Sequence, residues 1–127
     1  MSNLQIEANL GFKADKFHVV LSLVEFDEDN VTIIYSPALD LSGYGYDKVE
    51  AKNSFSEALH EFFRYTNSKQ TLDKVLKELG WSVSGSKKQP KFNPPKDSEL
   101  VFSNPLYNEI VNNKSYKVSR EDVEFSY

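Results

Sequence analysis

The chain contains no cysteine, and this absence removes several kinds of chemistry at once. Disulfide bonds, thiol nucleophiles and thiolate metal sites all depend on that residue. A chain without cysteine fits a reducing compartment, and we therefore predict a cytoplasmic protein.

Positive charge is scarce as well. The sequence has 15 Lys and Arg residues against 19 Asp and Glu residues, which gives a formal net charge of −4. The phosphate backbone of a nucleic acid is held by a broad cationic surface, which this balance does not favour. We expect a basic protein partner, and nucleic-acid binding only where a separate DNA-binding unit is present.

Long apolar runs are also missing. The N-terminal sequence MSNLQIEANLGFK has no basic region followed by an apolar stretch, so it does not predict a signal peptide. No segment approaches the ~20 apolar residues of a membrane-spanning helix. We predict a soluble protein that does not bind membranes, and its 127 residues suit one domain of ordinary size.

The first third of the chain has the residue pattern of strands. Residues 4–10 alternate apolar and polar side chains, which predicts a half-buried strand. Residues 17–24 and 31–35 are denser in β-branched and aromatic residues and predict more central strands. Asp and Asn favour turns, so residues 25–30 are predicted to turn between them. The simplest topology is an antiparallel meander of three strands, which Pro37 ends.

A helix is expected after Gly43 and Gly45, which give the backbone freedom to turn. Asp47 and Glu50 have the spacing of a capping box. One face of this helix is predicted to pack on the sheet through residues at helical spacing, namely Ala51, Phe55, Ala58, Leu59, Phe62 and Tyr65.

A second helix is predicted from the N-cap Thr71 to the stop at Gly80. Trp81 and Val83 are then expected to return to the sheet as a fourth strand. Beyond Ser84 the chain is rich in Pro, Gly and Lys, which is typical of a linker or an extended arm. A short helix is predicted at residues 105–111, and edge strands at 116–118 and 123–125.

These elements predict an α+β fold: a three- to four-stranded, mainly antiparallel sheet with two helices on one face and a C-terminal arm. We divide the chain into a domain at residues 1–86, a Lys- and Pro-rich linker at 87–97, and an arm with a short helix and an edge strand at 98–127.

The stretch at residues 31–63 resembles the HicB-like antitoxin family. It has a strand, the segment Tyr-Ser-Pro-Ala-Leu-Asp-Leu at residues 35–41, a glycine-bearing turn, and a helix with small and apolar residues. The positions that match the family's helix are Glu50, Ala51, Ala58 and Leu59. The resemblance covers residues 4–87 and implies a truncated RNase H-like core. It also implies a non-catalytic antitoxin that occludes a small basic ribonuclease toxin.

The chain departs from that family at two places. Family members often have a Pro-Gly-Cys turn where this chain has Leu-Asp-Leu-Ser-Gly at residues 39–43. They also commonly end in a helix-turn-helix or ribbon-helix-helix unit, and neither pattern follows Ser84.

Carboxylates are the first candidates for chemistry, because an RNase H-like nuclease holds two divalent metals with them. The acidic turn at residues 25–30 is expected to be a solvated hairpin. Asp40 follows a strand but has no predicted carboxylate partners, so we expect a turn residue or a partner contact. His18 and His60 have no partner set, and Lys87, Lys88, Lys91 and Lys96 are expected to solubilise a linker. We predict no catalytic residue, no metal site and no cofactor.

Tyrosines favour a different role for the central stretch. Aromatic side chains with a polar tip are enriched at protein interfaces. We predict a partner-binding surface from Tyr35, Asp40, Ser42, Tyr44 and Tyr46. The alternative is that some of these tyrosines pack against the first helix. Residues 118–127 are further predicted to add an edge strand to another subunit, which would give a homo-oligomer.

Three functions follow, in order of support. The first is a HicB-like antitoxin that binds a small basic toxin, and the second is a stand-alone interaction protein with the same fold. A nucleic-acid binder or a hydrolase is disfavoured by the net charge and by the missing catalytic set.

Overall fold

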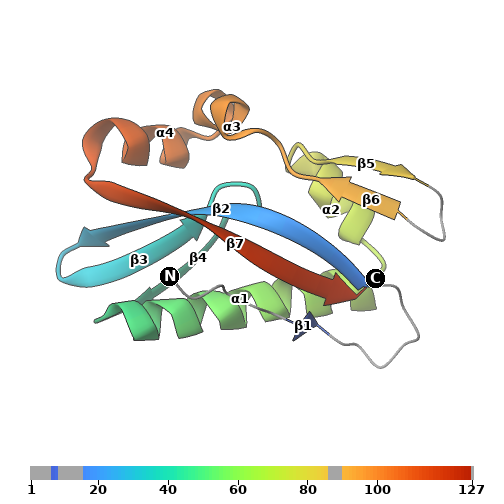
Figure 1. Cartoon of the computed structure of the whole chain (residues 1–127), viewed down its shortest axis with the longest axis horizontal. Helices are drawn as coiled ribbons and strands as arrows, with labels where there is room; N and C mark the ends of the chain where they lie inside the picture. Colours follow the sequence, from blue (N-terminus) through green and yellow to red (C-terminus); the bar gives the residue numbers. More distant parts are fainter. Residues whose placement is uncertain (1–6, 9–15, 86–89, 127) are drawn as a thin grey trace.

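The computed structural model describes residues 7–8, 16–85 and 90–126, which form an α+β fold around one sheet (Figure 1). Four antiparallel strands make up the sheet, and a short fifth strand runs parallel to one edge. The predicted fold class is confirmed. In spatial order the strands are β1 (Glu7–Ala8), β7 (Tyr116–Ser126), β2 (Lys16–Glu28), β3 (Val31–Ser36) and β4 (Leu41–Gly45).

The hairpin between β2 and β3 is tighter than the sequence predicted. β2 continues to Glu28, which pairs with Val31, so only Asp29 and Asn30 form the turn. Both turn residues have positive φ, 51° and 66°, as the twist of a two-residue hairpin demands. The predicted six-residue turn is wrong because acidic residues at the exposed end of a strand can still pair through their backbone.

β7 supplies the fourth antiparallel strand, where the sequence predicted a C-terminal arm with two short edge strands at residues 116–118 and 123–125; the structure has one continuous strand between β1 and β2. It pairs with β2 over eleven positions, from Lys16 opposite Ser126 to Phe26 opposite Tyr116. The last part of the predicted arm, β7, therefore belongs to the main sheet of the same chain. Of the strand predicted at residues 4–10, only Glu7–Ala8 lies within the described residues.

Helix α1 (Lys48–Ser68) begins at the predicted N-cap, where the Asp47 carboxylate accepts a hydrogen bond from the Glu50 amide at 2.8 Å. The sequence identified the first half of its buried face correctly. In the second half Phe63 is buried, Phe62 is half-buried, and Tyr65 is 56% exposed. The buried residues of α1 are Ala51, Phe55, Leu59, Phe63 and Thr66.

α1 lies directly on β4 because two glycines of that strand let it approach. A Cβ atom at Gly43 would lie 2.2 Å from the Phe55 amide nitrogen, and one at Gly45 would lie 2.3 Å from Glu50 Cβ. The two glycines are alternate residues of one strand, so they face the same side of the sheet. They serve close packing and not the turn that the sequence predicted.

Helix α2 (Leu72–Glu78) ends as predicted at Gly80, which has φ of 95°. The Gly80 and Trp81 amides donate to the carbonyls of Lys77 and Leu76, the pattern of a Schellman motif. The chain does not then rejoin the main sheet: β5 (Ser82–Gly85) pairs with β6 (Pro90–Asn93) in a separate hairpin. Residues 90–93, predicted as linker, thus form a strand, and residues 87–89 lie outside the described residues.

Helices α3 (Asp97–Ser103) and α4 (Pro105–Asn113) lie on the opposite side of the sheet from α1 (Figure 1). The short helix predicted at residues 105–111 is confirmed as α4, while α3 was not predicted. Helices therefore cover both faces, whereas the sequence predicted them on one. The core on the α3–α4 side contains Val24, Phe26, Tyr35, Leu100, Tyr107 and Ile110. None of the described helices has both the length and the apolar character needed to span a membrane.

Candidate protein-binding surface

Four of the five predicted partner-binding residues form an exposed strip along β4. Gly43 and Gly45 face α1, so the alternating residues Ser42 and Tyr44 face the other way. Tyr44 is 68% exposed, and Tyr46, just beyond the strand, is 83% exposed. Asp40 and Ser42 are exposed as well. We call Asp40, Ser42, Tyr44 and Tyr46 the β4 strip.

Tyr35, the fifth predicted residue, is a core residue that holds Asp40 in place. Its side chain is 2% exposed. Its hydroxyl donates to Asp40 Oδ1 at 2.5 Å and accepts from the Asn104 side-chain amide at 2.8 Å. Asn104 is in turn the N-cap of α4, where its Oδ1 accepts from the Tyr107 amide at 3.0 Å. The Asp40 carboxylate is thereby tied to the start of α4.

The ionisation of Tyr35 follows from this setting. Burial, followed by the hydrogen bond to Asp40, raises the pKa of Tyr35 to about 12. The phenol is therefore protonated at neutral pH and donates to the carboxylate. Asp40 itself has φ of 54°, a left-handed conformation that Asp tolerates better than most residues.

The free edge of β4 is already occupied by side chains of α1. The Tyr44 amide donates to Ser54 Oγ at 3.2 Å, and the Tyr46 amide donates to Glu50 Oε2 at 2.9 Å. An added strand would need those amides, so it would have to displace both side chains. A partner that binds at this edge would therefore contact the side chains of the β4 strip and not its backbone amides.

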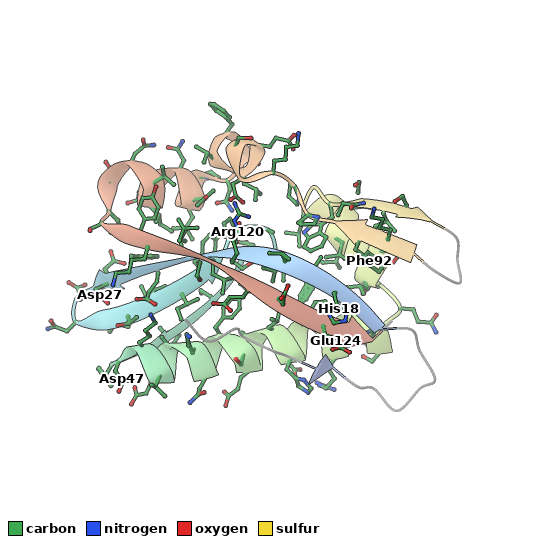
Figure 2. All side chains as sticks on the ribbon, in the orientation of Figure 1. His18, Asp27, Asp47, Phe92, Arg120 and Glu124 are labelled. Atoms are coloured by element: carbon green, nitrogen blue, oxygen red, sulfur yellow. The ribbon has the colours of Figure 1, made fainter. Side chains whose placement is uncertain are left out.

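One end of the β4 strip lies near the acidic β2–β3 hairpin. Asp27 pairs with Thr32, which pairs with Gly45 on its other side, so the hairpin carboxylates lie two strands from the end of β4. Asp27 and Asp47 are found at the same end of the molecule (Figure 2). Asp40 lies at the other end of β4, so the fold does not bring together the carboxylates considered for metal binding. Within the described ranges, no group of three or more His, Asp or Glu side chains is placed to hold a metal ion.

A groove of about 360 Å³ opens beside Asp40. It lies between the turn after β3, the end of α2 and the α3–α4 junction. We call it the Asp40 groove; its lining includes Pro37, Asp40, Glu78, Leu79, Leu100 and Pro105. Sequence reasoning found only Asp40 among them. Asn104 and Pro105 are a typical start of a helix and can be recognised in the sequence. No local pattern in the sequence shows that Glu78 lies near Asp40.

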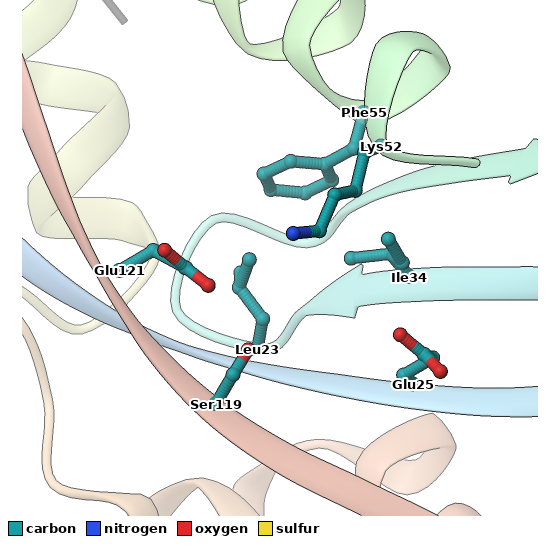
Figure 3. Close-up of a pocket in the computed structure, with 7 residues that line it drawn as sticks. All are labelled: Leu23, Glu25, Ile34, Lys52, Phe55, Ser119 and Glu121. Atoms are coloured by element: carbon teal, nitrogen blue, oxygen red, sulfur yellow. The ribbon is translucent and has the colours of Figure 1, made fainter. Parts of the chain in front are cut away.

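A second cavity lies beneath α1 and contains the buried carboxylate Glu121, which is 2% exposed (Figure 3). Glu121 comes from β7, and the Lys52 side chain extends from α1 into the same space (Figure 3). The cavity measures about 20 Å³, which is room for a single water molecule. It is too small to admit a substrate.

The remaining candidate residues lie apart from one another. The His18 side chain is 69% exposed and its Nε2 lies 3.9 Å from a Glu124 carboxylate oxygen, while His60 is exposed on α1. Lys91 and Lys96 are both exposed, at separate places, and Lys87 and Lys88 lie outside the described residues.

Comparison with known proteins returned no match among family models, curated proteins or solved structures. The resemblance to the HicB-like antitoxin family therefore stays a prediction from the sequence.

Proposed function

We propose that the chain is a non-catalytic protein-binding module whose β4 strip binds a basic protein. The observation that carries this proposal is the exposure of Tyr44 and Tyr46, at 68% and 83%, although their backbone amides are already bonded to side chains of α1. Tyrosine gives a large, rigid contact area with a polar tip, and it is enriched among the residues that dominate binding energy.

The charge of the chain supports a basic partner. The formal net charge is −4, and carboxylates lie at both ends of the β4 strip. Complementary charge speeds association and disfavours the wrong partners. On the HicB-like resemblance, we propose that the partner is a small basic ribonuclease toxin, occluded sterically and electrostatically in the cytoplasm. A stand-alone interaction protein would use the same surface for a different basic protein.

Capture of partners from a lysate of the native host tests the proposal. We expect the full chain to retain a short basic protein, and the double variant Tyr44→Ala/Tyr46→Ala to bind it at least about tenfold more weakly. Tyr65→Ala is the matched control, because this exposed tyrosine of α1 lies outside the β4 strip.

The antitoxin and the stand-alone interaction protein are expected to capture different partners. A captured protein that cleaves RNA, and stops when the chain is added, supports the antitoxin. A basic protein without that activity supports the stand-alone module. Binding that the double variant leaves unchanged, with both proteins folded, contradicts the β4 strip as the contact surface.

A further inference from the structure

We propose that the Asp40 groove is a receptor for an arginine side chain of the partner. This inference rests on the proposed function and adds the chemistry by which the partner is recognised. It assigns a role to Glu78 and to the α3–α4 junction, neither of which belongs to the β4 strip.

The lining of the groove fits a cation with an apolar stem. Its volume, about 360 Å³, is at the lower end of the range for ligand sites. Its charged lining residues, Asp40 and Glu78, are both acidic, and none of the described residues that line it is basic. Its apolar lining residues are Pro37, Leu79, Leu100 and Pro105, of which Leu79 and Pro105 are the more accessible. Arginine packs its methylene groups on such surface while its head group meets carboxylates.

Asp40 is held ready for such a contact. Its Oδ1 is fixed by the Tyr35 hydroxyl, whose own position is fixed by Asn104. Within the described ranges, no side chain is bonded to the other oxygen, Oδ2. A carboxylate that is already oriented loses little conformational freedom when a guanidinium binds. The planar guanidinium also offers several N–H donors in a fixed geometry, which an ammonium group does not.

The surroundings of the groove favour a protein over a free cation. The α3–α4 junction exposes Phe102 at 90% and Leu106 at 45%, and these two residues flank the groove residues 103–105 in the sequence. Exposed large apolar side chains are typical of surfaces that bind another protein. The side chain bound in the groove would then belong to a chain that also covers Phe102 and Leu106.

A capped hexa-arginine peptide is a direct probe of the groove. Titration of the full chain, followed by amide chemical shifts in NMR, should place the largest changes at Asp40, Glu78 and the α3–α4 junction. Asp40→Asn and Glu78→Gln should each weaken binding by up to about fivefold, since each removes one exposed ion pair. Asn keeps the left-handed conformation accessible at position 40. Glu57→Gln, an exposed carboxylate of α1, removes the same charge elsewhere and should leave binding unchanged.

Two further peptides separate the possible outcomes. Hexa-citrulline, the neutral analogue, should not bind, and hexa-lysine should bind more weakly than hexa-arginine. Equal binding of the arginine and lysine peptides, or equal loss in all three single variants, overturns the arginine receptor.

The captured partner distinguishes this inference from the function on which it rests. If Glu78→Gln binds the partner as the wild type does and Tyr44→Ala/Tyr46→Ala does not, the groove assignment fails and the β4 strip stands. If neither variant changes capture, the proposed function fails as well. Weaker capture by both supports the groove as part of the contact surface.

Discussion

The contact between Gly43 and α1 gives the sharpest test of how the β4 strip is held. Gly43→Ala adds one methyl group whose carbon would lie 2.2 Å from the Phe55 amide nitrogen and 2.5 Å from its Cα. Both atoms belong to helix backbone and cannot rotate away. Restoring an ordinary contact of 3.4 Å requires α1 to withdraw from β4 by about 1.2 Å, the difference between the two distances.

That movement has a definite cost. Overpacking of a well-packed core costs about 1–3 kcal/mol. The bond from the Tyr44 amide to Ser54 Oγ is already 3.2 Å long and would be lost, at about 1 kcal/mol. We expect Gly43→Ala to lower the free energy of unfolding by about 3 kcal/mol, a large part of the 5–15 kcal/mol typical of a domain.

Urea denaturation followed by Trp81 fluorescence measures this, since Trp81 is the only tryptophan and is buried. With an m-value of about 1–3 kcal/mol/M, the midpoint should fall by about 1–3 M. Ser42→Ala is the matched control, because its exposed side chain points away from α1, and it should change stability by less than about 0.5 kcal/mol. A Gly43→Ala variant as stable as this control would refute the account of α1 packing on glycine.

Three further perturbations have outcomes that the structure fixes. Folding raises the pKa of Tyr35 from 10.0 to about 12, so the folded state favours the protonated phenol, and the free energy of unfolding should fall as pH rises from 10 to 12. Tyr35→Phe should make this fall less steep in urea titrations at a series of pH values. An equally steep fall in the variant would contradict the role of Tyr35. Asp47→Ala should destabilise by about 1 kcal/mol while Asp47→Asn, another good N-cap, should not, and equal unfolding midpoints for the two would rule out the cap. Deletion of residues 116–127 removes a strand from the sheet and should abolish cooperative unfolding measured by circular dichroism. A truncated chain that still unfolds cooperatively would show that the fold does not need β7.

Local signals in the sequence predicted the elements whose ends are fixed by neighbouring residues. The N-cap at Asp47 and the stop at Gly80 are both determined within one helical turn, and both are where they were predicted. Phe62 and Phe63 show the limit of such signals. Either residue fits helical spacing after Leu59, and the choice depends on how α1 crosses the strands beneath it.

Local sequence patterns did not predict strand pairing and burial that depend on residues far apart in the chain. Trp81 and Val83 have the composition of a strand, but nothing local shows that this segment pairs with β6 and not with the main sheet. Tyr35 looked like a surface tyrosine because its partner Asn104 is 69 residues away. Two glycines at alternate positions before a helix also fit the close approach of α1 to β4 at Gly43 and Gly45. The sequence alone does not distinguish this packing from the turn that it predicts.

The pairing of β2 with β7 has a consequence for how the chain is made. Their side chains meet across 98 residues, as in the hydrogen bond from Arg120 to Ser22. Contacts so distant in sequence slow folding, and on the ribosome one side of β2 stays open until residues 116–126 have emerged. The nascent chain therefore presents an uncovered strand edge until β7 is available to pair with it.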